Sequence, residues 1–221
     1  MSLSPRWEFG SFSMQLKEAM EARTSVRTYL PEPVSVDDLK EMVRLAGRAP
    51  SLNNAQPWKY YAVVEASRCQ RIASLVEQKL HTILPEPKTD AQQKATSKLF
   101  DYVGLFGRAP ALLIVATRIY PGFLDDALMT TGLAREAADA VRGHPYAMSL
   151  GASIENLLLA ATDMGYGACW LTVPQVASAS IERDVGIEAP WRLGAVISVG
   201  RPAQEAIQSP KKPIEEIFSV L

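Results

Sequence analysis

The sequence predicts a single domain in which helices cover both faces of a central sheet. Strands that are separated by helices favour such a mixed sheet. The 221 residues contain no repeat, low-complexity tract or internal linker, and their hydrophobic content of 48% is that of an ordinary globular protein. We therefore assign residues 1–221 to one domain, with 1–13 as a flexible N-terminal extension. Segments with strand character, each followed or preceded by helical periodicity, are found at 58–64, 111–116, 168–173 and 193–199.

Composition excludes several classes of function. The net charge of −1 provides no basic field for nucleic acid. Cys69 and Cys169 are far apart and form no C-x-x-C motif, and His81 and His144 are isolated, so we expect no metal site. The sequence has no run of about 18 apolar residues, so we expect no membrane span and a cytoplasmic location.

The first two predicted helices flank a basic segment. Residues 14–22 have apolar side chains at helical spacing, and Pro31 and Pro33 then predict a stiff, extended connection. A second helix should begin after Ser35, whose hydroxyl suits the N-cap position. Its buried stripe is predicted to consist of Leu39, Met42, Val43 and Ala46.

The remaining elements follow from periodicity. The continuous apolar run at 111–116 is typical of a strand buried on both faces. Residues 148–164 are apolar on nearly every side, which predicts a central helix or one that packs against a partner subunit. Residues 120–144 have only a weak helical pattern, over 134–141, and a long insertion of this kind often covers a site. Further helices are predicted at 67–80, 90–102 and 180–185.

Common nucleotide-binding and nucleophile motifs are absent from the sequence. There is no P-loop and no G-x-S-x-G elbow. The stretch Gly165-Tyr-Gly167 begins like a dinucleotide fingerprint, but Trp170 stands where the third glycine belongs and the segment enters a strand. An enzyme with this sequence would therefore rely on a cofactor for its chemistry.

The basic segment Arg23–Arg27, with the sequence R-T-S-V-R, is the first candidate binding site. The forked donors of Arg23 and Arg27 match a phosphate, and the hydroxyls of Thr24 and Ser25 add hydrogen bonds. The same residues also fit an ordinary helix end, where arginines offset the helix dipole. From the spacing alone, the ordinary helix end is the favoured interpretation, because basic helix ends are common.

Two further polar segments are candidates. The loop Ala49–Trp58 is rich in amide side chains, which can read the edge of a planar heterocycle, although Pro, Ser and Asn also favour plain turns. Lys211 and Lys212 lie between two prolines and could close over a phosphate, or could belong to a solvated tail.

In this order, the segments resemble the nitroreductase family of FMN-dependent oxidoreductases. The resemblance extends from about Met14 to the last lysines. It is carried by R-T-S-V-R-T-Y from Arg23, A-P-S-L-N-N-A-Q-P-W from Ala49, G-Y-G-A-C-W-L from Gly165 and the late P-K-K-P. The family implies an α+β fold with a mostly antiparallel sheet, and an intertwined homodimer with FMN at the subunit interface.

The resemblance also assigns roles to residues. It implies that Arg23, Thr24 and Ser25 meet the FMN phosphate, and that Arg27 approaches the pyrimidine edge of the flavin ring. The backbone N–H of Thr172 would face flavin N5, with Leu171 and Val173 beside it. Many relatives have glycine where this chain has Val173, which narrows the space over the ring. Residues implied to reach the flavin from the partner subunit are Pro50, Ser51, Leu52 and Asn54, and Lys211 or Lys212 would complete the phosphate site.

The implied activity is electron transfer from NADH or NADPH through FMN to a nitroaromatic, a quinone or a similar electrophile. Arg27 and the Thr172 backbone are the expected catalytic groups, since a positive charge near the pyrimidine edge stabilises anionic reduced flavin. The alternatives are another chemistry on the same fold (dehalogenation, flavin fragmentation or oxidation of a heterocycle) and a flavin-binding protein without catalysis.

Overall fold

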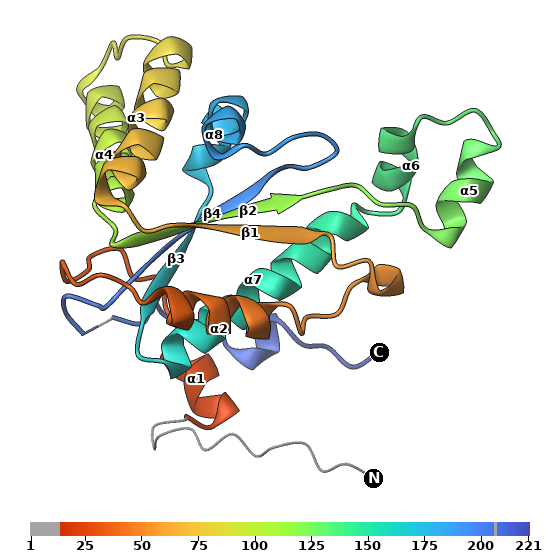
Figure 1. Ribbon diagram of the computed structural model, residues 1–221, viewed down its shortest axis with the longest axis horizontal. Coiled ribbons are helices and arrows are strands. Elements are labelled where there is room, and N and C mark those ends of the chain that lie inside the picture. The colour runs from red at the N-terminus through yellow and green to blue at the C-terminus, as the bar shows by residue number, and fades with distance from the viewer. Residues whose placement is uncertain (1–13, 206) are drawn as a thin grey trace.

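The computed structural model describes residues 14–205 and 207–221, so the prediction for residues 1–13 lies outside the described residues. Its centre is a four-stranded sheet in the order β1-β2-β4-β3 (Figure 1). The strands are β1 (Trp58–Val63), β2 (Ala111–Thr117), β3 (Gly167–Leu171) and β4 (Arg192–Gly200). All three neighbouring pairs are antiparallel. The α+β fold is therefore confirmed, whereas the mixed sheet expected from strand order alone is wrong, because the connecting helices return each strand in the opposite direction.

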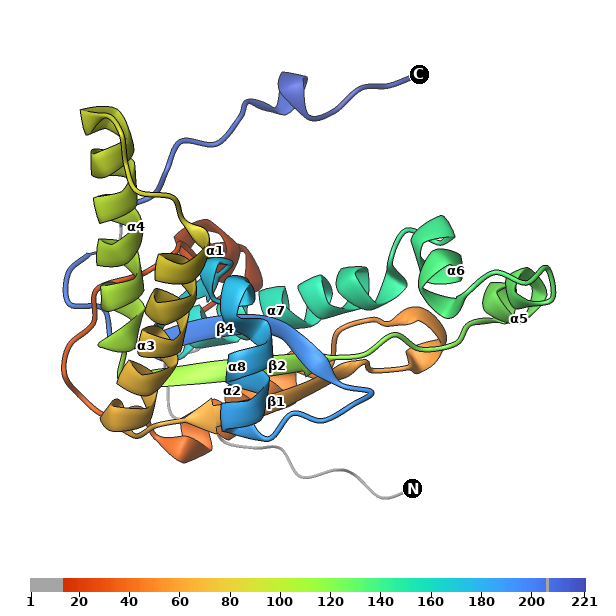
Figure 2. The same cartoon turned by 90° about the horizontal axis from the view of Figure 1, so that it is seen from above.

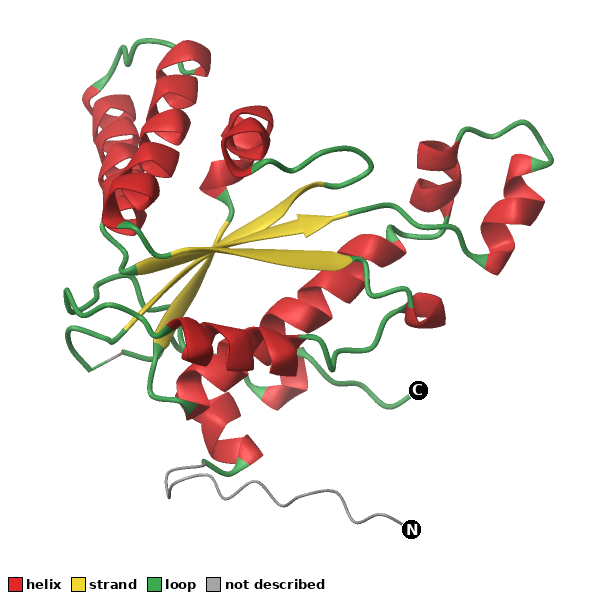
Figure 3. Cartoon of the chain, viewed as in Figure 1, coloured by secondary structure: helices red, strands yellow, loops and turns green. Residues whose placement is uncertain are grey.

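The strand β2 forms the middle of two hydrophobic cores. All seven of its residues are buried, as the continuous apolar run predicted. Because side chains alternate along a strand, Leu112 and Ile114 enter one core while Leu113 and Val115 enter the other. Helices consequently cover both faces of the sheet (Figure 3).

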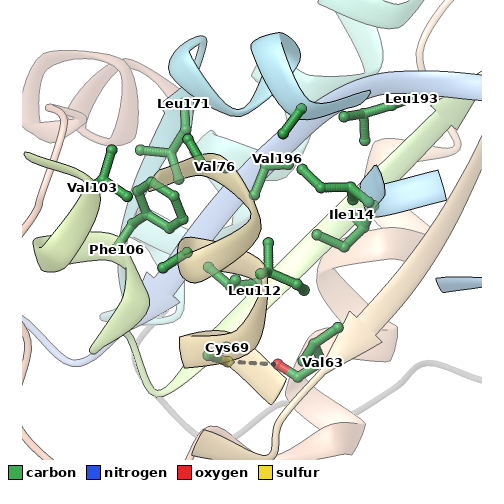
Figure 4. Packing of buried hydrophobic residues seen from close by; sticks show 14 of the residues in the cluster. Val63, Cys69, Val76, Val103, Phe106, Leu112, Ile114, Leu171, Leu193 and Val196 are labelled. Atoms are coloured by element: carbon green, nitrogen blue, oxygen red, sulfur yellow. Dashed lines mark hydrogen bonds between the residues drawn. The ribbon is translucent and has the colours of Figure 1, made fainter. Parts of the chain in front are cut away.

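The first core lies under a helical hairpin. The helices α3 (Ala66–Ile83) and α4 (Asp90–Gly107) pack against each other, and α8 (Ser178–Val185) lies beside them. Val76 of α3, Phe106 of α4 and Ile114 of β2 are buried together in this core (Figure 4).

The second core lies under α2 (Val36–Ala46) and α7 (Pro145–Asp163), which pack against each other. The N-cap of α2 is Ser35, whose Oγ accepts from the backbone N–H groups of Asp37 and Asp38, as predicted. Short helix α1 (Leu16–Ala22) packs on α7. The predicted stripe of α2 is buried at Leu39, Met42 and Ala46, and Val43 is half-buried against the same core.

The insertion at 120–144 forms two short helices, α5 (Phe123–Met129) and α6 (Arg135–Val141). They pack against each other and project from the sheet as one arm, which both views place at the same end of the molecule (Figure 2). The sequence pattern predicted α6 but not α5. Short 3₁₀ turns complete the described secondary structure at Leu52–Asn54, Val173–Ala177 and Ile214–Glu216.

The Ser35 cap can be tested by stability measurements. Ser35→Ala leaves the first N–H groups of α2 without their side-chain acceptor, and we expect a loss of about 1 kcal/mol in unfolding free energy. Ser35→Asp supplies another acceptor and should retain stability. Urea unfolding of both variants would check this, and equal losses in the two would contradict a capping role.

Candidate functional site

The basic segment Arg23–Arg27 lies along the outer edge of the sheet. β3 is the last strand, with β4 on one side, and Ser25 forms a parallel bridge with Ala168 on the side that β4 leaves open. The backbone N–H of Val26 donates to the Ala168 carbonyl oxygen at 3.1 Å. The segment therefore leaves α1 at Arg23 and extends the sheet, so it is more than a solvated helix end.

Two glycines allow this close approach. A Cβ on Gly167 would lie 2.6 Å from the Val26 side chain, and a Cβ on Gly200 would lie 2.9 Å from the Tyr29 ring. The Tyr29 hydroxyl donates to the carbonyl oxygen of Val26 at 2.6 Å and lies 2.7 Å from Ser198 Oγ. Burial raises the pKa of this hydroxyl, which keeps it protonated as a donor. The segment is thus held to the sheet by both backbone and side-chain contacts.

The two arginines have different neighbours. Arg23 Nε lies 3.6 Å from Glu155 Oε1 on α7. Arg27 Nη1 donates to the Ser25 carbonyl oxygen at 3.4 Å, and its guanidinium lies 5.9 Å from the centre of the Tyr102 ring. A guanidinium has five N–H donors, and these contacts engage few of them. Both arginines therefore retain donors for an anionic ligand.

The C-terminal tail is tied to the same place by Gln208. Its side-chain Nε2 donates to the carbonyl oxygens of Ala22 at 2.7 Å and Arg23 at 3.3 Å. Lys211 follows three residues later, a stretch that spans at most about 10 Å. Both Lys211 and Lys212 are exposed, and Lys212 Nζ lies 3.6 Å from Glu216 Oε2. The hydrogen bonds of Gln208 therefore keep Lys211 and Lys212 near Arg23 in space. Beyond these residues, the tail leads away from the sheet (Figure 2).

At the end of β3, the exposed Thr172 lies between Leu171 and Val173, which both contact the core. Leu171 ends the strand and its side chain is buried in the first core. Thr172 is exposed, and Val173 is half-buried against the same core. The strand predicted to reach residue 173 stops at 171, because Pro174 has no N–H to continue a ladder. From Ala168 to Thr172 this edge spans about 13 Å.

The Ala49–Trp58 loop has an unusual backbone. Asn53, Asn54 and Gln56 all have positive φ, at 53°, 52° and 44°. Asn accepts this left-handed conformation readily, but each such residue costs of order 1–3 kcal/mol unless its surroundings hold it. Here Ser51 Oγ accepts from the Gln56 backbone N–H at 3.0 Å. A plain turn would not need three left-handed residues, which points to a functional role for the loop.

The same loop borders the main cavity, which has a volume of about 680 Å³. The cavity lies between the loop, the α5–α6 arm and the beginning of α7. Its lining is mainly apolar, with Arg142 as the charged member, and includes Pro50, Leu52, Phe123, Leu124 and Met148.

Within one chain, the predicted site residues form two groups. Ser25 and Arg27 border a separate cleft of about 190 Å³ with residues of the tail, whereas Pro50, Ser51 and Leu52 border the main cavity. Neither lining includes Thr172 or Lys211. The two groups therefore border different cavities of the chain.

Several contacts at these places carried no recognisable signal in the sequence. Glu155 was one polar residue on an apolar helix, and Gln208 stood in a tail without periodicity. Arg142 lay in the insertion that matched no motif. Each gains its position from contacts between distant segments, which spacing along the chain does not encode.

No cluster of His, Cys, Asp and Glu suited to a metal ion is found among residues 14–205 and 207–221. In the same part of the chain, no helix is both long enough and apolar enough to cross a membrane.

The family model for the nitroreductase family matches residues 20–201. The chain belongs to the nitroreductase family. The crystal structure of a BluB-like flavoprotein from Clostridium difficile 630 is 32% identical to it, with a TM-score of 0.81, and the match covers 94% of this chain and 99% of that one.

Proteins that are less similar to the chain differ in their names. The 5,6-dimethylbenzimidazole synthase of Rhodospirillum rubrum is 26% identical, over 88% of this chain and 85% of its own length. An FMN and NADPH-dependent nitroreductase from Sphigopyxis sp. strain HMH shares the fold at a TM-score of 0.71 and 18% identity, with coverage of 94% and 99%. The chain's relatives therefore carry names that refer to different reactions.

The packing of Gly167 against Val26 can be tested. Gly167→Ala introduces a Cβ 2.6–2.7 Å from three Val26 carbons. We expect a loss of about 1–3 kcal/mol in unfolding free energy, as for other overpacked sites, and faster hydrogen exchange of the Val26 amide. Gly104→Ala is the control, because its nearest neighbour is the flexible end of Arg108 at 3.4 Å and alanine favours a helix. Unchanged Val26 exchange in Gly167→Ala would contradict this packing.

Proposed function

We propose that the chain binds FMN along the outer edge of β3 and uses it as an oxidoreductase. The observation that carries the proposal is the Ser25–Ala168 bridge, because it sets the basic segment beside the outer edge of β3, which leads to the exposed Thr172. The names of family members that include flavoprotein and FMN support the same conclusion.

The donor set fits the phosphate of FMN. Arg23, Thr24 and Ser25 supply a guanidinium and two hydroxyls at one end of the β3 edge, and each is at least partly exposed. Gln208 is hydrogen-bonded to the Arg23 carbonyl oxygen, and Lys211 and Lys212 follow it by three and four residues, so both lysines can lie near Arg23. A phosphate monoester carries nearly two negative charges near neutral pH, so this cluster of cations and hydroxyls is complementary to it.

The ring end of the cofactor would use other groups. Bound FMN would supply electron transfer between a reduced nicotinamide, NADH or NADPH, and an acceptor. Arg27 would place positive charge beside the pyrimidine edge, where it stabilises negative charge on the reduced ring. The backbone N–H of Thr172 would face N5, with Leu171 and Val173 beside it. The protein's own task in this scheme is to hold the ring and to admit the substrates.

A homodimer is part of the proposal. Pro50, Ser51, Leu52 and Asn54 belong to the strained loop, which a second copy would bring over the FMN held by the first. Exposed apolar residues support association, because a monomer rarely exposes so many. In the tail they are Ile214, Ile217, Phe218 and Val220, which are 59–84% exposed.

The acceptors we propose are nitroaromatics, quinones or similar electrophiles. An apolar cavity of this size suits a flat, largely apolar molecule, and its border with the Pro50–Asn53 loop would place the acceptor near the flavin of the second chain. The relatives named as a 5,6-dimethylbenzimidazole synthase and as an iodotyrosine deiodinase keep open a second chemistry on the same site.

Spectroscopy of the purified protein tests this function. We expect bound flavin with its visible absorbance, and bleaching by NADH or NADPH under anaerobic conditions. A panel of acceptors should then restore the colour. Protein that retains flavin but is not bleached by either nicotinamide would contradict the reductase, and protein that takes up no FMN would contradict the cofactor assignment.

Two arginine variants should separate phosphate binding from ring binding. Arg23→Met should weaken FMN binding by about tenfold or more while leaving riboflavin, which has no phosphate, nearly unaffected. Arg27→Met should weaken both flavins alike and slow reduction by the nicotinamide. Arg44→Met, which removes only an exposed surface pair with Glu41, is the control. Equilibrium titration with FMN and riboflavin measures both effects, and an unchanged FMN-to-riboflavin ratio in Arg23→Met would refute the phosphate role.

A further inference from the structure

The α5–α6 arm contains a buried cluster of charges that the proposed function does not use. Arg142 Nε lies 2.8 Å from Asp125 Oδ1, and Arg142 Nη2 lies 3.5 Å from Asp139 Oδ1. The side chains of Arg142, Asp125 and Asp139 are only 5%, 2% and 2% exposed. Asp139 Oδ2 is also 2.9 Å from His144 Nδ1. Taking such charges out of water is costly even when they are paired, and the best-attested use of buried ionic groups is to specify one geometry.

The cluster fixes one turn of the arm. The backbone N–H of Gly122 donates to Asp125 Oδ2 at 2.7 Å, so one carboxylate joins the turn to Arg142. Gly122 has no Cβ, and one built there would lie 2.2 Å from Arg142 Nη1. Phe123 and Leu124 lie between these two anchored residues in the sequence.

Phe123 and Leu124 are also the arm's contribution to the main cavity, together with Arg142 itself. Opposite them in the lining are Leu52 of the strained loop and Met148 of α7. Phe123 is 93% exposed, so it contributes little to the core of the fold. Its position is therefore set by the anchored turn and not by packing in the protein interior.

We propose that Asp125 and Arg142 are positioning residues: their buried ion pair holds Phe123 and Leu124 over the cavity in the place where they contact the acceptor. This inference rests on the proposed function, since it takes the cavity to be the acceptor site. The ion pair would give the α5–α6 arm one fixed conformation at the cavity.

The two carboxylates differ in what faces them, and this difference supplies a matched pair of variants. One oxygen of Asp125 accepts from the Gly122 N–H and the other forms an ion pair with the Arg142 guanidinium, so Asn in its place must turn an NH₂ toward one of these positively polarised groups. Asp139 faces Arg142 on one side and His144 Nδ1 on the other, and a neutral imidazole nitrogen can accept from an amide. Asp125→Asn should release the turn, whereas Asp139→Asn should be tolerated.

The experiment compares Asp125→Asn, Asp139→Asn, Phe123→Ala and the double variant Phe123→Ala/Asp125→Asn in the full-length protein. The first measurement is the dissociation constant of nitrobenzene for the oxidised protein, read from changes in the flavin spectrum. We expect about tenfold weaker binding in Asp125→Asn and in Phe123→Ala, and less than about twofold change in Asp139→Asn. The double variant should be no worse than Phe123→Ala, because Asp125 acts through that side chain.

The second measurement separates positioning from general stability. FMN affinity should be retained in Asp125→Asn even where the thermal midpoint falls, while KM for 1,4-benzoquinone rises. Equal nitrobenzene affinities in Asp125→Asn and Asp139→Asn, full additivity in the double variant, or wild-type binding in Phe123→Ala would each overturn the inference. Phe123→Ala remains decisive if Asp125→Asn does not fold, because its side chain is exposed. A wild-type protein that binds no flavin would refute the proposed function instead.

Discussion

The rest of the structure depends on the burial of β2 on both faces. Its side chains alternate between two cores, so helices must cover both sides of the sheet, α3, α4 and α8 on one and α2 and α7 on the other. Only the edges of the sheet then remain for a ligand. One edge strand, β1, leads out of the strained Ala49–Trp58 loop, and the other, β3, carries the basic segment. Both candidate binding features therefore lie at an edge because the middle of the sheet is fully used for stability.

The outer edge of β3 has a basic segment bonded to its beginning and an exposed residue just after its end. Gly167 and Gly200 lack the side chains that would keep the Val26 and Tyr29 region away, so a basic segment can bond to the sheet backbone. The bridge holds the first end of the edge, while Pro174 ends the strand soon after the second. The groups proposed to bind the phosphate and the backbone proposed to face the ring are thus separated by the length of one short strand. Rigid secondary structure fixes this separation better than a loop could.

Much of the fold could be predicted from local patterns, because β2, α2 and α7 each carry a periodicity that packing reinforces. The direction of neighbouring strands could not, since it depends on how each connecting helix returns to the sheet. For the candidate site, the sequence identified Arg23, Ser25 and Arg27 as a possible anion grip but also as a plain helix end. The Ser25–Ala168 bridge joins segments more than 140 residues apart, and no spacing rule encodes such a contact. The contacts of Gln208 and the ion pair of Asp125 with Arg142 could not be predicted for the same reason, because they also join separate segments.

Two features of the single chain are energetically unfavourable as they stand. The loop with three left-handed residues stores strain beside a cavity, while the tail holds exposed apolar residues with little of the chain to cover them. Strained backbone conformations persist where surrounding contacts hold them in place. Exposed apolar surface of this extent marks a place where another molecule binds. The proposed homodimer would meet both requirements if the second copy brings its loop to the β3 edge and offers apolar surface to the tail. The buried charges in the arm fit the same picture, because α5 and α6 pack mainly on each other and the ion pair of Asp125 with Arg142 adds an internal anchor that packing on the sheet does not provide.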